Sequence, residues 1–152
     1  RYATEKEKDA FDRRVLSAAA ESLPEGFSMG LIGEEDYRRC GQAAWSRDLT
    51  AQYPDYDSYR RTGLGVLVKK DGVPVSGASS YSSFPGGIEI EIDTREEFRR
   101  KGLAFACGAR LILECLDRGL YPSWDAHNLA SLNLARKLGY RLSHSYTAYL
   151  LE

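Results

Sequence analysis

Residues 88–93 read Ile-Glu-Ile-Glu-Ile-Asp, a strict alternation of isoleucine and acidic residues. Successive side chains of a β-strand point to opposite faces, so this pattern predicts a strand that buries three isoleucines on one face and presents three carboxylates on the other. Two turn sequences, KKDG at 69–72 and PGG at 85–87, separate this strand from apolar runs over 64–68 and 73–81. Because short turns join neighbouring antiparallel strands, the sequence predicts a three-stranded meander that ends at Asp93.

Helical and strand patterns continue on both sides of the meander. Before it we expect a helix over 6–22, a strand over 27–32, a helix over 34–49 and a loop or short helix over 53–59. After it we expect a helix over 101–117, a strand over 120–125, a helix over 128–138 and a final strand or hairpin over 141–151. A chain of 152 residues supports one hydrophobic core. We therefore expect an N-terminal helix and linker over 1–24 and one α/β domain over 25–152.

Charge and cysteine content restrict the partners and the compartment. The 21 Lys and Arg nearly balance the 22 Asp and Glu, so we expect no nucleic-acid partner, which would need a strongly basic face. No apolar run reaches the roughly 18 residues that span a bilayer, and no secretion signal opens the chain, so we expect no membrane association. Cys40, Cys107 and Cys115 lie in helical patterns, which is typical of reduced core thiols in a cytoplasmic protein. His127 and His144 are not spaced with cysteines as zinc ligands would be, so we expect no metal.

The sequence Arg-Arg-Lys-Gly-Leu-Ala at 99–104 opens the helix that follows the alternating strand. The start of a helix presents unpaired backbone N–H groups and a partial positive charge, and a glycine there lets a phosphate approach the backbone. The segment therefore predicts an anion site, although a basic helix start with a glycine that eases packing has the same sequence pattern.

Two motifs in order connect this loop to a known family. Arg99-x-x-Gly102-x-Ala104 is followed about 30 residues later by a helix that begins at Asn128 and ends at Leu-Gly-Tyr, residues 138–140. With the order of elements, residues 27–151 resemble the GNAT superfamily of acetyl-CoA-dependent N-acetyltransferases, and residues 87–139 resemble the subgroup that includes zwittermicin A self-resistance acetyltransferases. The resemblance implies an α/β (α+β) GNAT fold: a mixed, mostly antiparallel central sheet flanked by helices, with a splay between the fourth and fifth strands.

The resemblance also implies where acetyl-CoA would bind. Its pyrophosphate would lie over the loop amides, its pantetheine would lie in the splay, and a backbone amide near Asp93 would face the thioester carbonyl. The residues implied in this binding are Ile92, Asp93, Thr94, Arg99, Arg100, Lys101, Gly102, Leu103, Ala104, Asn128 and Ser131.

Acetyl transfer needs a neutral amine, so a base must remove a proton from an alkyl ammonium. Glu89, Glu91 and Asp93 share one strand face, and their mutual repulsion should raise at least one pKa. We expect Glu91 to be the base, with Glu89 as the second candidate; an ordinary solvated strand face is the alternative. The tyrosine that many GNAT enzymes use to protonate the thiolate is replaced by Ala135, which leaves the Ser131 hydroxyl on that side of the helix.

The sequence says less about the acceptor substrate than about the cofactor site. We expect a small-molecule amine, with antibiotics among the candidates, contacted by Tyr56 and Trp124, and a homodimer stays open. Two other functions stay open as well. One is an acyl-CoA-binding regulatory module with little catalysis, and the other is acetylation of a protein amino terminus or of an aminoacyl-tRNA.

Overall fold

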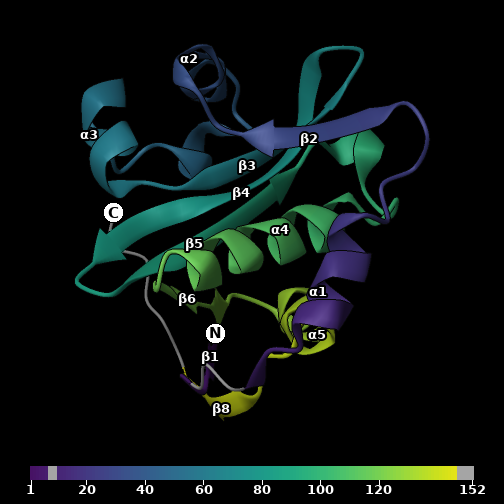
Figure 1. The fold of residues 1–152 in the computed structure, drawn as a ribbon, viewed down its shortest axis with the longest axis vertical. Coiled ribbons are helices and arrows are strands. Elements are labelled where there is room, and N and C mark those ends of the chain that lie inside the picture. The colour runs from purple at the N-terminus through teal and green to yellow at the C-terminus, as the bar shows by residue number, and fades with distance from the viewer. Residues whose placement is uncertain (7–9, 147–152) are drawn as a thin grey trace.

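The computed structural model describes residues 1–6 and 10–146 (Figure 1). Its α-helices are α1 (Arg13–Ala20), α2 (Glu34–Gln42), α3 (Tyr56–Thr62), α4 (Leu103–Asp117) and α5 (Leu129–Leu138). Its strands are β1 (Tyr2–Thr4), β2 (Phe27–Leu31), β3 (Gly65–Lys70), β4 (Val73–Phe84), β5 (Gly87–Thr94), β6 (Tyr121–Ser123), β7 (Asp125–Ala126) and β8 (Leu142–Ser145). Two short 3-10 helices are η2 (Arg47–Leu49) and η3 (Glu96–Phe98).

The main sheet has the strand order β2-β3-β4-β5-β6. Strands β2 to β5 pair antiparallel, with Val66 opposite Ala78 and Ala78 opposite Ile92, whereas β6 runs parallel to β5. The predicted meander and the predicted mixed, mostly antiparallel sheet are therefore confirmed.

The two faces of this sheet are covered by different helices (Figure 1). On one face, α4 packs Leu103 and Leu111 against Val66 and Ile88. On the other face, α2, α3 and η2 enclose a cluster that includes Tyr59, Leu49 and Leu67. Because the isoleucines of β5 face α4, the alternation turns the acidic side chains of β5 towards α2 and η2.

The predicted splay is present between β5 and β6. These strands pair only from Gly87 opposite Tyr121 to Glu89 opposite Ser123. The chain then leaves the main sheet, and β7 pairs with β1 instead. Among the described residues, the edge of β5 from 90 to 94 therefore has no strand on the side away from β4. This gap lies between the fourth and fifth strands of the sheet, as expected.

A second sheet has the order β7-β1-β8. Tyr2 of β1 lies opposite Ala126 on one side and opposite Ser145 on the other. The helix expected over 6–22 is wrong at its start, because residues 2–4 form a strand and Asp12 caps α1 by accepting a hydrogen bond from the Arg14 amide. The final strand expected over 141–151 spans Leu142–Ser145, and its last part lies outside the described residues.

The helix expected over 34–49 is shorter in the structure. Helix α2 ends at Gln42, Ala43 is extended, and η2 follows after three more residues. The Ser46 hydroxyl donates to the carbonyl of Cys40, at 2.8 Å, and so satisfies a backbone group that the ended helix leaves open. The segment expected as a loop or short helix contains α3, which begins at Tyr56 after the Asp55 cap.

Gly65 provides a test of the packing between α3 and the sheet. A Cβ atom at this position would meet the Tyr59 hydroxyl and would lie 2.6 Å from Ile32 Cδ1 and from Ser79 Oγ. We expect Gly65→Ala to lower the free energy of unfolding by about 2–3 kcal/mol, measured by chemical denaturation, because the buried Tyr59–Ser79 contact must shift. Gly30→Ala is the matched control, since a Cβ there meets nothing within 4 Å. Equal stability of the two variants would contradict this packing.

Candidate functional site

The loop before α4 has the backbone geometry of an anion site. Gly102 is the N-cap of α4 and has a φ of 77°, and Arg100 has a φ of 64°. A Cβ atom on Gly102 would meet nothing within 4 Å, so the space beside this glycine is open. The amides of Leu103 and Ala104 lie in the first helical turn, where backbone N–H groups have no partner within the helix. The loop therefore presents unpaired donors to an open space.

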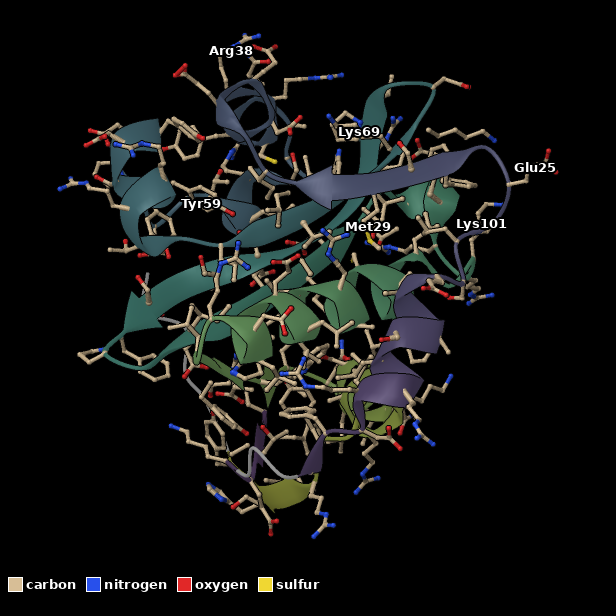
Figure 2. The ribbon with its side chains drawn as sticks, viewed as in Figure 1. Glu25, Met29, Arg38, Tyr59, Lys69 and Lys101 are labelled. Atoms are coloured by element: carbon tan, nitrogen blue, oxygen red, sulfur yellow. The ribbon has the colours of Figure 1, made fainter. Side chains whose placement is uncertain are left out.

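Positive charge surrounds these donors. Arg99, Arg100 and Lys101 are all exposed, and Figure 2 shows Lys101 near the start of α4. The Arg99 side chain donates from Nε to the Thr94 carbonyl at 3.4 Å, which ties the loop to the end of β5. The predicted binding residues 92–94 and 99–104 therefore lie next to one another, from the open edge of β5 to the first turn of α4.

The other wall of the gap is formed by β7 and the start of α5. Asn128 caps α5, where its Oδ1 accepts from the Ser131 amide at 2.8 Å. The Trp124 indole N–H donates to the Ser131 hydroxyl oxygen at 3.2 Å. The Ser131 hydroxyl therefore keeps its own hydrogen for donation to another group.

Glu91 and Asp93 form a carboxyl pair on the acidic face of β5. Burial raises the pKa of Glu91 to about 8, and the hydrogen bond to Asp93 and the negative charges of Asp93 and Asp48 act in the same direction. Burial also raises the pKa of Asp93, although the hydrogen bond from Glu91 opposes this shift. One carboxylate oxygen of Asp93, Oδ2, is buried without a hydrogen-bond partner. Both shifts favour a proton retained on this pair, and Asp93 keeps an unpaired acceptor oxygen.

A third carboxylate, Asp48 of η2, acts on this pair. Its negative charge raises the pKa of both Glu91 and Asp93. Leu49 anchors η2 here, because its side chain is fully buried against Gly77 of β4. A Cβ atom on Gly77 would lie only 2.8 Å from Leu49 Cδ1. Gly77 is opposite Asp93 in the sheet, so η2 lies beside the carboxyl pair. Sequence reasoning missed Asp48, since 43 residues separate it from Glu91 and no local motif marks it.

Cationic groups on the side of the gap between β5 and β6 act on Asp93 through their charge. The charges of His127 and Arg99 both lower its pKa, while Arg1 lowers the pKa of Glu91 and forms an ion pair with Asp125 at 3.4 Å. Asp93 therefore lies between the acidic groups and the basic loop.

The structure also places Glu89, Trp124 and Tyr56, and the alanine at the position of the family's tyrosine. Glu89 is half-buried in the part of β5 that still pairs with β6. Trp124 is 4% exposed and packs against Tyr140, with a distance of 5.3 Å between ring centroids. Tyr56 is the first residue of α3, and its ring lies 5.8 Å from that of Tyr37. Ala135, at the position of the family's tyrosine, is fully buried.

The three cysteines are buried and not disulfide-bonded, as expected. In residues 1–6 and 10–146, no group of three or more His, Cys, Asp or Glu is arranged to hold a metal ion. None of the helices in the described part of the chain combines the length and the apolar character needed to cross a membrane.

Comparisons with known proteins agree with this geometry. The model of the GNAT acetyltransferase family matches residues 1–149. The uncharacterized N-acetyltransferase YdfB of Bacillus subtilis (strain 168) is 34% identical over 129 residues, which are 84% of this chain and 49% of that protein. The crystal structure of a GCN5-related N-acetyltransferase-like protein from Streptococcus suis 89/1591 is similar with a TM-score of 0.93 at 54% identity, and the match covers 95% of this chain and 57% of that chain. The chain thus spans about half the length of these relatives.

More distant structures share the fold alone. The aminoglycoside acetyltransferase meta-AAC0020 from an uncultured soil metagenomic sample, in complex with sisomicin, is similar with a TM-score of 0.58 at 13% identity; the match covers 84% of this chain and 97% of that chain. Together with the Streptococcus structure, it confirms the expected α/β fold, a mixed sheet flanked by helices.

Proposed function

Because the chain belongs to the GNAT acetyltransferase family, we propose that it transfers an acetyl group from acetyl-CoA to a primary amine of a small molecule, with both substrates bound at once. The observation that carries this proposal is the half-buried Glu91–Asp93 pair on β5, the strand that precedes η3 and the proposed anion-binding loop. An amine substrate and a phosphate-bearing cofactor can therefore meet at one strand.

The residues around the loop fit acetyl-CoA. The space beside Gly102 is open, the first-turn amides of α4 lack helical partners, and three basic side chains follow one another. Residues 92–94 and 99–104 would hold the cofactor from one side, and Asn128 and Ser131 would do so from the other. Acetyl-CoA supplies a thioester whose carbonyl carbon accepts the amine lone pair and whose thiolate departs.

The carboxyl groups prepare the amine for this reaction. An alkyl ammonium has a pKa near 10.4, so a base whose own pKa is about 8 removes its proton more readily than an ordinary carboxylate would. Glu91 takes the proton after losing its own to solvent, Asp93 holds Glu91 in place, and Asp48 attracts the incoming cation. Glu89 remains the second candidate for the base.

Two assignments complete the proposal. Ser131 donates its hydroxyl hydrogen towards the departing thiolate, and because a thiol has a pKa near 8.5, a weak donor is sufficient. Tyr56 and Trp124 bound the acceptor side. We also propose that residues 25–152 form the catalytic domain and that residues 1–24 pack onto it through β1 and α1.

We propose as well that residues 87–139 place the chain in the zwittermicin A resistance subgroup.

Calorimetric titration with acetyl-CoA, followed by thiol release in the presence of a panel of amines, tests this function. We expect micromolar binding of acetyl-CoA and amine-dependent release of CoA. A folded chain that does not bind acetyl-CoA would contradict the cofactor site. Binding without transfer to any amine, peptide or aminoacyl-tRNA would instead identify a regulatory module.

A further inference from the structure

A hollow of about 360 Å³ lies on the α2 face of the main sheet. Helix α2 and the segment after it contribute Arg39, Gln42, Trp45 and Ser46, and the ends of β4 and β5 contribute Pro74 and Arg95. Two arginines line this hollow, and no Asp or Glu does. In a chain with more acidic than basic residues, this excess of positive charge is a local feature.

The hollow lies on the same face of the sheet as the carboxyl pair of the candidate site, and Arg95 connects the two along the chain. Ser46 lies two residues before Asp48, and Arg95 lies two residues after Asp93. The Arg95 amide donates to the Val75 carbonyl at 2.9 Å, so the pairing of β4 and β5 continues past Thr94. Residues 93 and 95 therefore point to the same side of the sheet, and their backbones are about 7 Å apart. The acidic site and the basic hollow follow one another along one face.

Both guanidinium groups keep donors for a ligand. Arg39 donates from Nη1 to the Gly72 carbonyl at 3.1 Å, and the described residues give it no carboxylate partner. Arg95 forms an ion pair with Glu97 at 2.6 Å, but the Glu97 side chain is 62% exposed, so this contact is weak. A guanidinium group has five N–H donors in a planar arrangement that matches carboxylate and phosphate oxygens.

We propose that this hollow binds an anionic group of the acceptor, so that the substrate is an amine that carries a carboxylate or phosphate several bonds away. This inference rests on the proposed function. The ammonium end of such a substrate lies against Glu91, Asp93 and Asp48, and the anionic end lies between Arg39 and Arg95. A hollow of this volume holds a small organic group. The two charged regions together select a substrate with opposite charges at its ends.

Matched amines test this proposal. The substrates are hexylamine, ε-aminocaproate and hexamethylenediamine, which share one carbon chain and differ at the far end; aminobutyl phosphate separates phosphate from carboxylate recognition. We expect kcat/KM to be about tenfold or more higher for an anionic substrate than for hexylamine. In Arg39→Gln and Arg95→Gln, this ratio falls towards one. Equal values for the anionic and neutral amines, or a preference for the diamine, would overturn the proposal.

Arg38→Gln is the control variant. Arg38 is the neighbour of Arg39, it forms an ion pair with Glu35, and Figure 2 shows it on the side of α2 away from the sheet. We expect it to retain the preference for the anionic amine. If no amine is acetylated, the proposed function fails, and calorimetric binding of ε-aminocaproate then decides this inference separately. Binding that Arg39→Gln weakens and Arg38→Gln does not would support it, and no binding would overturn it.

Discussion

We expect Glu91→Gln to lower kcat for acetyl transfer by about 100- to 1000-fold and to leave the affinity for acetyl-CoA nearly unchanged. The substitution keeps the size of the side chain but removes the group that we propose takes the proton from the amine, and general-base catalysis contributes on this scale. The wild-type rate should depend on pH in a defined direction. Because the pKa of Glu91 is raised to about 8 and only its deprotonated form accepts a proton, the rate increases as the pH rises towards and through about 8. Initial rates of thiol release across this range measure the effect, and the increase should be absent in Glu91→Gln.

Two further variants decide which carboxylate is the base. Glu89→Gln makes the same change two residues earlier on β5, so a larger loss in Glu89→Gln than in Glu91→Gln would assign the base to Glu89. Asp48→Asn should move the midpoint of the pH profile to a lower value, because it removes a negative charge that raises the pKa of Glu91. A midpoint that does not move would contradict the contact between η2 and the carboxyl pair.

We expect Gly102→Trp to weaken acetyl-CoA binding by about 100-fold or more. The indole would fill the open space beside the first turn of α4, where the cofactor's pyrophosphate would contact backbone amides. A side chain at a φ of 77° also adds about 1–2 kcal/mol of backbone strain. Calorimetric titration with acetyl-CoA measures the loss of binding.

Gly119→Trp separates blocking from strain. Gly119 lies just after the other end of α4, its φ is 69°, and a Cβ there also meets nothing within 4 Å. The two variants therefore share the backbone strain, but only the one at Gly102 covers the loop. Thermal unfolding should shift similarly in both, while Gly119→Trp keeps its affinity for acetyl-CoA. Equal loss of binding in both variants would show that strain in α4, rather than occlusion of the loop, weakens the site.

The parts of this fold that the sequence predicts correctly depend on local sequence patterns. The alternation at 88–93 is specific to a strand with two unlike faces, and Asn128 and Gly139 mark both ends of α5 because capping depends on a few neighbouring residues. The loop at 99–104 is equally local. These elements make up the proposed cofactor side of the candidate site, so that part of the proposal follows from local sequence.

The acceptor side depends on contacts between distant segments. Asp48 reaches the carboxyl pair only because Leu49 packs onto Gly77, and α2 ends at Gln42 although the alanines that follow are good helix formers. Arg39 and Arg95 come to one hollow from segments more than 50 residues apart. No local motif indicates such contacts between distant segments. The sequence alone therefore predicted neither the position of Asp48 beside the carboxyl pair nor the basic hollow.

The small sheet has a consequence for the order in which the protein forms during synthesis. Strand β1 leaves the ribosome before the rest of the described chain, but its partners are β7 and β8, which follow more than 120 residues later. Contacts of such long sequence separation form late, after the loop between them has closed. The main sheet and α4 can assemble on a nascent chain, whereas the wall formed by β7 and α5 is complete and held by β1 only after residue 138 has emerged. A nascent chain should therefore acquire its meander first and its capacity for acetyl-CoA last.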